Sequence, residues 1–447
     1  MSAHQTAPGS HAELTATAGM RKRGTSAAQL ANRLLADLAD GKLAQLPVAI
    51  RFWDGSMLAP RDRNDVPVVV ANDRRALAHL LYQPGQVGLA RAWVDGSLTV
   101  QGDLDDVLQT RHEFDGVSLS FEDRVRLAIA AVRIAGPAVL RRPPVPSIEA
   151  SVAGERHSLA RDSSSVRHHY DVSNDFYRLV LGPTMVYSCA YFSTGEETLE
   201  EAQARKLDLI CRKLRLSEGE RFLDVGCGWG SLVIHAAVNY GVSALGVTLS
   251  EQQARLARER VRERGLQDRV EIRVADYREL DDEPFDKIAS VGMYEHVGRA
   301  ELPRYCQTID GLLRPGGLFL NHGIARLYSE EPTSDTFITR YVFPDGELHP
   351  LADLITAMQA TGLEVRDTES LRDHYPLTLR RWLANLLERR SEAVALVGPE
   401  RTRAWELYML GSAQGFEDSE ITVYQVLSVR RGATPDLPLD RSELLAT

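Results

Sequence analysis

Residues 222–230 read Phe-Leu-Asp-Val-Gly-Cys-Gly-Trp-Gly, and this stretch decides the fold. An apolar run at 221–225 leads into three alternate glycines, and a helical pattern follows at 231–240. Glycines at such a corner let the backbone approach a ligand at the helix N-terminus. A dinucleotide site favours GxGxxG, whereas the pattern here is DxGxGxG. It suits a small cationic ligand with an amino acid moiety, whose carboxylate faces the helix and whose ammonium faces Asp224.

Outward from this corner, strand patterns alternate with helix patterns. Alternation of this kind predicts an α/β doubly wound, mostly parallel sheet. The segment 421–429 alternates apolar and polar residues, which predicts a strand with one face more exposed. We expect a turn at 314–317, and the other strands and helices at 221–225, 231–240, 243–248, 251–264, 270–275, 285–291, 301–313 and 318–321.

Polar side chains follow the second and third strands of this pattern. Thr248 ends the second strand, with Gln253 one helical turn further on, and Asp276 and Tyr277 follow the third. Hydroxyl and amide groups can bind ribose hydroxyls, a carboxylate can accept from an adenine amino group, and an aromatic ring can stack on the base. A Thr or Ser before a helix is more often a helix cap, so each signal alone is weak. Their order predicts one crevice at the carboxyl ends of the strands.

The chain outside this pattern is divided by composition. Residues 27–38 have helical spacing, and 47–52, 66–70 and 98–100 have strand patterns. Three prolines within 143–146 favour an extended connector. We expect a disordered tail at 1–25, a smaller N-terminal α+β domain at 26–142, a proline-rich linker at 143–156, the α/β domain at 157–431 and a loose tail at 432–447.

Charge and cysteine content narrow the class of protein. Asp and Glu total 62 against 52 Lys and Arg, a net charge of −10, which disfavours a nucleic acid partner. We expect no secretory leader and no membrane-spanning helix, because no apolar run has the required form or length. The four cysteines contain no CxxC pair, so we expect no metal site and a reduced, cytoplasmic protein.

Several longer motifs carry a resemblance to a known family. The segments 168–177 (His-His-Tyr-Asp-Val-Ser-Asn-Asp-Phe-Tyr), 187–192 (Tyr-Ser-Cys-Ala-Tyr-Phe) and 292–298 (Gly-Met-Tyr-Glu-His-Val-Gly) closely resemble the cyclopropane-fatty-acyl-phospholipid synthase family. The segments 341–346 and 374–379 are similar to it too. The resemblance is strong over 157–431 and loose before it. It implies the seven-stranded sheet of class I methyltransferases and the cofactor S-adenosylmethionine.

The resemblance also implies roles for single positions. The cofactor residues that it implies are Tyr187, Ser188, Asp224, Gly226, Gly228, Thr248, Leu249, Gln253, Asp276 and Tyr277. It implies a bound bicarbonate that serves as the base. The ligands that it implies for this ion are Cys189, Glu295, His322, the backbone of Ile324 and Tyr375. Some members carry a cysteine in the segment matching 408–416, where this chain has Ser412.

The implied reaction adds a one-carbon unit to the cis double bond of an unsaturated fatty acyl chain of a membrane phospholipid. Attack by the alkene leaves a carbocation, which aromatic faces stabilise. Loss of a proton from the incoming methyl then closes a cyclopropane ring. Without the resemblance, Glu295 itself is the natural candidate for the base. The family further implies a homodimer and an enzyme associated peripherally with the inner face of the membrane.

The sequence leaves other outcomes open. The same attack can give a methylene- or methyl-branched chain, with a separate reductase. The acyl substrate can be bound to a carrier, and a non-catalytic lipid- or cofactor-binding protein is the alternative of another class. The pairs Arg74-Arg75 and Arg141-Arg142 can meet anionic head groups, although a solvated surface role suits either pair taken singly.

Overall fold

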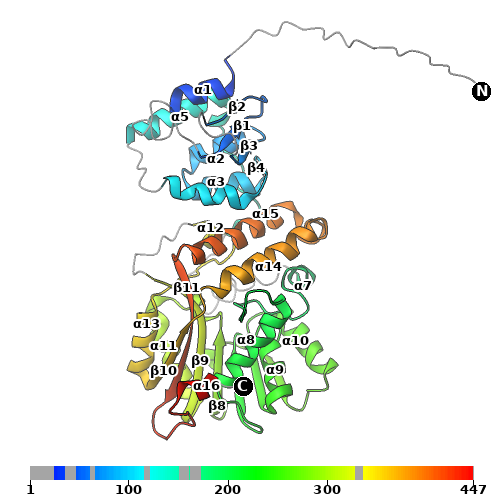
Figure 1. Ribbon diagram of the computed structural model, residues 1–447, viewed down its shortest axis with the longest axis vertical. Helices are drawn as coiled ribbons and strands as arrows, with labels where there is room; N and C mark the ends of the chain where they lie inside the picture. Colours follow the sequence, from blue (N-terminus) through cyan, green and yellow to red (C-terminus); the bar gives the residue numbers. More distant parts are fainter. Residues whose placement is uncertain are drawn as a thin grey trace, which may run out of the picture.

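The computed structural model describes residues 25–35, 47–60, 66–114, 121–150, 161, 173–327 and 336–445. The tail expected at 1–25 therefore lies outside the described residues, except for Thr25. Residues 151–156 of the expected linker and residues 168–172 of the first family motif also lie outside them. A small N-terminal unit stacks on a larger α/β unit, with α14 and α15 near the junction (Figure 1). None of the described helices is long and apolar enough to cross a membrane.

The N-terminal unit is the expected α+β domain, built on a four-stranded sheet of order β2-β1-β3-β4. The turn at 53–56 leads into the short strand β2, which the sequence did not predict, and β3 then pairs parallel to β1. Its elements are α1 (Ala27–Leu35), β1 (Ala49–Arg51), β2 (Met57–Leu58), β3 (Val68–Ala71), α2 (Arg75–Tyr82), α3 (Gln86–Val94), β4 (Leu98–Gln101), α4 (Leu104–Gln109), η2 (Thr110–Phe114), α5 (Phe121–Ala135) and η3 (Pro137–Leu140).

The larger unit confirms the doubly wound sheet. Its seven strands have the order β10-β11-β9-β8-β5-β6-β7, and only the pairs made by β11 are antiparallel. The strands are β5 (Arg221–Val225), β6 (Ser243–Thr248), β7 (Val270–Val274), β8 (Phe285–Val291), β9 (Leu313–Arg326), β10 (Leu363–Ser370) and β11 (Ile421–Arg430). The order reverses beside β5, and ligands bind at such a switch point in open α/β sheets.

Helices cover both faces of this sheet (Figure 1). Thr198 and Glu201 form a capping box at the start of α8, and Ser250 caps α10, which gives two of these helices a defined start. The helices are α7 (Asn174–Leu181), α8 (Leu199–Lys213), α9 (Ser231–Tyr240), α10 (Glu251–Glu263), η4 (Tyr277–Glu279), η5 (Tyr294–His296), η6 (Arg299–Glu301), α11 (Leu302–Leu312), α12 (Phe337–Tyr341), α13 (Leu351–Thr361), α14 (His374–Glu388), α15 (Arg390–Glu417) and α16 (Arg441–Leu445).

Strand β11 differs from the expected half-exposed strand. It pairs with β9 and β10 along its two edges, and most of its residues are buried, with some in each of the two cores on either face of the sheet. Its polar positions are buried and bonded: Gln425 bonds the His322 ring, and Ser428 donates to the Phe319 carbonyl. The alternation therefore reflects internal hydrogen bonding, because a buried polar group needs a partner.

Two further expectations need correction near the sheet. The turn expected at 314–317 is a bulge inside β9, since Phe285 pairs with Leu313 and Lys287 with Leu318. The tail expected from 432 is not loose throughout, because residues Arg441–Leu445 form α16. Leu444 packs into the apolar core and Arg441 pairs with Asp367 at 2.6 Å, which holds this end of the chain against the sheet.

The two units meet through buried polar contacts. Arg91 of α3 pairs with Glu149 at 2.6 Å, and Glu149 also accepts from the Tyr341 hydroxyl at 2.8 Å. The Trp93 indole N–H donates to the Arg403 carbonyl at 2.9 Å, where α3 faces α15 (Figure 1). A charge pair this buried is strongly destabilising to break, so we expect the junction to be rigid.

Candidate cofactor crevice and buried polar set

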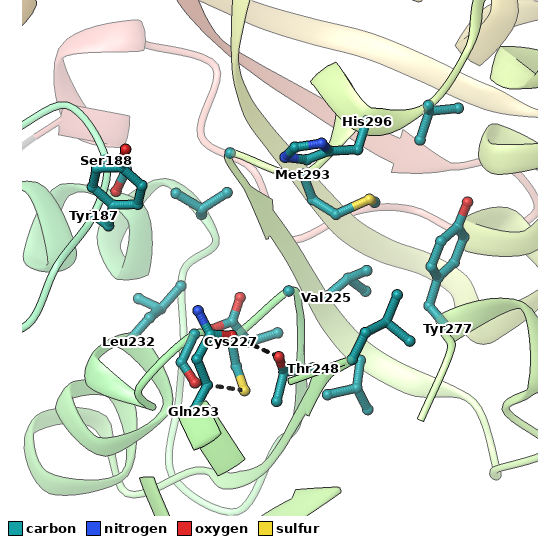
Figure 2. A pocket seen from close by; sticks show the side chains of 18 of the residues that line it. Tyr187, Ser188, Val225, Cys227, Leu232, Thr248, Gln253, Tyr277, Met293 and His296 are labelled. Carbon is teal, nitrogen blue, oxygen red and sulfur yellow. Dashed lines mark hydrogen bonds between the residues drawn. The ribbon is translucent and has the colours of Figure 1, made fainter. Parts of the chain in front are cut away.

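A cavity opens at the carboxyl ends of β5, β6, β7 and β8. Figure 2 shows Tyr187 and Ser188 on one side of it, Tyr277 on the other, and Thr248 and Gln253 below. All ten residues implied for the cofactor line this cavity: Tyr187, Ser188, Asp224, Gly226, Gly228, Thr248, Leu249, Gln253, Asp276 and Tyr277. The structure therefore brings together segments that are far apart in the chain.

The glycine-rich turn after β5 is bonded to β6 on one side and is open on the other. The backbone N–H groups of Gly226 and Cys227 both donate to the Val247 carbonyl, at 3.0 and 2.9 Å, which ties the loop to β6. Gly228 has φ +54°, and no heavy atom lies within 4 Å of where a Cβ would stand. Glycine is favoured there because other residues rarely adopt this conformation. The loop thus presents bare backbone to the cavity at the start of α9.

Asp224 is a buried carboxylate at the wall of the cavity. Its Oδ1 has no hydrogen-bond partner among the described residues, and its side chain belongs to a residue 2% exposed. Burial raises the pKa of Asp224 to about 7, while the nearby Lys206 ammonium acts to lower it. A carboxylate with an orphaned oxygen beside a cavity fits the ammonium of an amino acid moiety, which would restore the missing partner.

Lys206 of α8 was not predicted from the sequence. It is buried, its Nζ donates to the Ser188 hydroxyl at 2.8 Å, and burial lowers its pKa to about 8. Gln203, one turn earlier, donates to the Ser188 carbonyl at 2.9 Å. Helix α8 therefore fixes Ser188 from both sides and places a cation within the cavity wall. In an amphipathic helix pattern, such a lysine is indistinguishable from a solvated one.

Polar groups on the opposite side of the crevice bond one another. The Thr248 hydroxyl donates to Gln253 Oε1 at 2.7 Å, so the amide N–H₂ of Gln253 is left to face a ligand. Asp276 accepts from the guanidinium of Arg278 at 2.7 Å, a partner the sequence analysis did not assign. The carboxylate thus has a fixed orientation, and its remaining lone pairs suit an amino group.

Aromatic rings close the crevice. The Tyr187 hydroxyl donates to that of Tyr408 at 3.1 Å, and its ring stacks on Trp405 with centroids 5.8 Å apart. Tyr277 meets Tyr305 edge to face at 5.8 Å. These contacts hold both tyrosines in place, which favours a site already shaped for its ligand.

The residues implied as bicarbonate ligands are buried or half-buried and do not line this crevice. Glu295 in η5 accepts from the Ile324 N–H at 2.7 Å through Oε1, while Oε2 has no partner among the described residues. The Ile324 carbonyl accepts from the Tyr294 hydroxyl at 2.8 Å. The Ile324 N–H is therefore committed to Glu295 and is not open to a bound anion. Burial raises the pKa of Glu295 to about 7.

His322 lies two residues before Ile324 on β9 and therefore on the same face of the sheet. Its Nδ1 is 3.2 Å from Gln425 Nε2, and its Nε2 has no partner among the described residues. With the Gln425 amide donating to Nδ1, Nε2 carries the proton. Burial holds the pKa of His322 well below its ordinary value, so the ring is neutral and offers one donor.

Backbone contacts link Cys189 to the strand that carries Ile324, whereas the ring of Tyr375 packs on Phe416 with centroids 4.5 Å apart. The Cys189 thiol is fully buried and donates to the Leu371 carbonyl at 3.7 Å, one turn before Tyr375. Leu371 N–H donates to the carbonyl of Val423, the strand partner of Ile324. Burial raises the pKa of Cys189, which keeps it a neutral thiol. We call Cys189, Glu295, His322, Ile324 and Tyr375 the buried polar set; none is among the described residues that line the crevice.

The larger part of the chain matches a known family. Residues 157–426 match the family described as mycolic acid cyclopropane synthetase. The chain belongs to this family. It is accordingly an S-adenosylmethionine-dependent methyltransferase, and the crevice fits that cofactor, because the orphaned Asp224 oxygen and the open backbone at Gly228 are suited to its methionine half.

Similar proteins agree with membership of the cyclopropane synthetase family. The chain is 39% identical over 406 residues to a probable fatty acid methyltransferase of Pseudomonas putida, which covers 89% of this chain and 96% of that protein. It is 38% identical over 264 residues to the cyclopropane-fatty-acyl-phospholipid synthase of Escherichia coli, covering 59% of this chain and 67% of that one. The mycolic acid cyclopropane synthase CmaA1 complexed with SAH and CTAB superposes with a TM-score of 0.57 at 35% identity, covering 60% of this chain and 98% of that one.

Two more cavity residues were missed although they stand in a family motif. Met293 and His296 flank Glu295, and both side chains project into the crevice (Figure 2). The Met293 Cβ is 3.3 Å from where a Cβ on Gly226 would lie, so it packs closely against the glycine-rich turn. The motif marked the segment, but only the turn geometry of η5 decides which side chain faces the cofactor and which faces the core.

Proposed function

We propose that this enzyme transfers a one-carbon unit from S-adenosylmethionine to the cis double bond of an unsaturated acyl chain in a membrane phospholipid, and that the product is a cyclopropane. The matched family and one relative support the proposal: the family is described by cyclopropane synthesis, and the E. coli relative is a cyclopropane-fatty-acyl-phospholipid synthase. The CTAB bound by CmaA1 carries a long alkyl chain, which fits a lipid-like substrate. The observation that carries the proposal is the pair of orphaned buried atoms, Glu295 Oε2 and His322 Nε2, in a chain that also has a cofactor crevice.

The residues of the crevice would bind the cofactor and orient its methyl group. S-adenosylmethionine supplies an electrophilic methyl group that a weak nucleophile such as an alkene can attack. Asp224 and the backbone at Gly228 would hold its methionine half, Thr248 and Gln253 its ribose, and Asp276 and Tyr277 its adenine. Fixing the reacting carbon in this way removes the entropy cost of bringing two molecules together.

The buried polar set would then remove a proton. After attack, the acyl chain is a carbocation, and loss of a proton from the added methyl closes the ring. Bicarbonate carries the groups that these two orphaned atoms lack: a hydroxyl that can donate to Glu295 Oε2 and oxygens that can accept from His322 Nε2. A bicarbonate held by these residues would supply the base that accepts the proton lost from the added methyl. The base would then be the bound anion, which accepts from the neutral His322 ring, and not the lone Glu295 carboxylate, in which burial favours protonation.

One alternative product has a specific observation in its favour. The relative that covers 89% of this chain is a probable fatty acid methyltransferase, whereas the cyclopropane synthase of E. coli covers 59%. A methylene- or methyl-branched acyl chain, completed by a separate reductase, is therefore the second candidate. A purely binding protein is disfavoured, because the chain belongs to a family of synthetases.

We further propose that the enzyme acts as a homodimer in the cytoplasm, associated peripherally with the inner face of the membrane. The N-terminal unit packs on α15 and contacts the larger unit through Trp93 and Glu149, so it can hold the enzyme at a surface or against a second copy. A phospholipid substrate requires such association, since exposing an acyl chain to water costs about 0.8 kcal/mol per CH₂.

A host that produces the protein and is fed methyl-labelled methionine tests the substrate class. We expect label in the acyl chains of the phospholipid fraction, with loss of the double bond in the labelled chains. Label that never enters lipid, although the purified protein binds S-adenosylmethionine, would overturn the assignment to acyl chains.

A further inference from the structure

Two arginine pairs that are distant in the sequence line one cavity of the N-terminal unit. Arg74 and Arg75 stand at the start of α2, and Arg141 and Arg142 follow η3. The cavity has a volume of about 500 Å³, and its other lining residues are alanines and prolines, with no carboxylate among them. The fold therefore converts two surface pairs into a single cationic pocket.

The scaffold beneath this pocket is well packed. The Tyr82 hydroxyl at the end of α2 donates to the Leu140 carbonyl of η3. Ala78, Ala135 and Val139 share an apolar cluster that joins α2, α5 and η3. Because α2 and η3 pack on the same core, the four arginines are held near one another despite their mutual repulsion. A bound anion would relieve that repulsion.

The four arginines are not equally satisfied. Arg75 pairs with Asp73 at 2.8 Å and with Asp95 at 3.4 Å. Arg74, Arg141 and Arg142 are exposed, and no described residue forms an ion pair or side-chain hydrogen bond with them. Three uncompensated guanidinium groups in one pocket stand out in a chain of net charge −10. Guanidinium groups match phosphate oxygens in geometry and charge.

Exposed aliphatic side chains flank the second arginine pair in the chain. Leu140 is 56% exposed and Val145 is 43% exposed, and they bracket the second arginine pair along the chain. A soluble phosphate has no use for exposed aliphatic side chains, whereas a lipid surface offers phosphates and acyl chains together. We infer that this pocket binds the phosphate of an anionic phospholipid and seats the N-terminal unit on the bilayer. The inference deepens the proposed function and rests on it.

Vesicle binding tests the pocket directly. The variant R141Q/R142Q removes two of the cations, and R262Q/R269Q removes two other exposed arginines, on and just after α10, that form no ion pair with described residues. Full-length proteins are sedimented with vesicles of phosphatidylcholine alone and with vesicles that also contain phosphatidylglycerol. An arginine near an anionic surface contributes about fivefold in binding, so we expect R141Q/R142Q to bind the anionic vesicles about 25-fold more weakly. We expect the control to bind like the parent protein.

Methyl transfer separates this inference from the proposed function. With the same phospholipid dispersed in detergent micelles, we expect R141Q/R142Q to turn over like the parent, and with anionic vesicles to turn over more slowly. Equal vesicle binding by R141Q/R142Q and the parent would overturn the pocket's role. Inorganic phosphate that binds the parent but not R141Q/R142Q, with unchanged vesicle binding, would overturn it in favour of a soluble anion. No transfer in micelles by the parent protein would instead overturn the proposed function.

Discussion

In the cofactor crevice Thr248 bonds Gln253 and Asp276 bonds Arg278, and of the ten cofactor residues Asp224 alone keeps a buried oxygen without a described partner. In the buried polar set both Glu295 and His322 keep one such atom. The crevice is open to solvent and holds its side chains ready by local bonds. The buried set is closed, and an unsatisfied polar atom there costs about 1–3 kcal/mol. The difference indicates two tasks: ligand binding in the crevice, and holding a small polar species in the buried polar set. Changes in the two regions should therefore alter different kinetic constants.

The largest effect is expected for Glu295→Gln. The amide would place a donor where the proposal needs an acceptor for the bicarbonate hydroxyl. We expect kcat for methyl transfer to fall about 100-fold or more, as for loss of a general base, with an unchanged Kd for S-adenosylmethionine. Kinetics and calorimetry on the same preparation measure both. Glu347→Gln, on a loop that contacts Glu295 through its backbone, is the control; turnover near the parent value in Glu295→Gln would refute the role.

Asp224→Asn should change binding instead. A charge-assisted bond to the ligand ammonium contributes about 1.5–3 kcal/mol, so we expect Kd for S-adenosylmethionine to rise about 10- to 100-fold. Because the pKa of Asp224 is raised to about 7, the carboxylate gains a proton and loses its charge as pH falls through that value. The parent protein should therefore bind more weakly below about pH 7. A flat pH profile in the parent would contradict the assignment.

A variant of Lys206 tests the amino acid half of the cofactor site separately from the adenosine half. We expect Lys206→Met to weaken S-adenosylhomocysteine binding about tenfold, because its ammonium orients Ser188 and favours ionised Asp224. Binding of 5′-methylthioadenosine, which lacks the amino acid half, should not change. Lys213→Met is the matched control, since Lys213 is also buried on α8 but pairs with Glu369 away from the crevice. Equal losses for both ligands would indicate a merely structural role.

The smallest effects are expected for two variants that each remove one orienting hydrogen bond, one in the buried polar set and one in the crevice. Gln425→Leu removes the bond that orients His322, and Thr248→Val removes the bond that orients Gln253. Each bond contributes about 0.5–1.5 kcal/mol, or roughly two- to tenfold. We expect the first variant to lower kcat and the second to raise Kd for S-adenosylmethionine. A fall in kcat for both variants, with Kd unchanged, would contradict the assignment of cofactor binding to the crevice and of catalysis to the buried polar set.

The crevice was largely predictable from sequence, because its residues follow strands whose ends meet at one edge of the sheet. Gly226, Thr248 and Asp276 occupy the same place relative to their strands, so their proximity follows from topology. Lys206 could not be predicted, since its helical pattern does not show that it turns inward. The commitment of the Ile324 N–H to Glu295 was equally hidden, because it depends on the turn geometry of η5.

Strands β10 and β11 show a second limit of prediction from the sequence. Alternation in 421–429 predicted a half-exposed strand, yet β11 has core residues on both of its faces, and β10, which pairs with its outer edge, has no strong pattern of its own. The pocket of Arg74 and Arg141 likewise depends on how α2 packs against η3. Such long-range pairings are set by tertiary packing, which local periodicity does not report.

The most direct test is the mass spectrum of an unsaturated phospholipid after incubation with the purified enzyme and trideuteromethyl S-adenosylmethionine, with and without bicarbonate. We expect the acyl chain to gain one carbon carrying two deuterium atoms, to lose its double bond, and to form in much lower yield when bicarbonate is removed. A product that retains all three deuterium atoms, or a yield that does not depend on bicarbonate, would contradict proton removal from the added methyl by an anion held at Glu295 and His322.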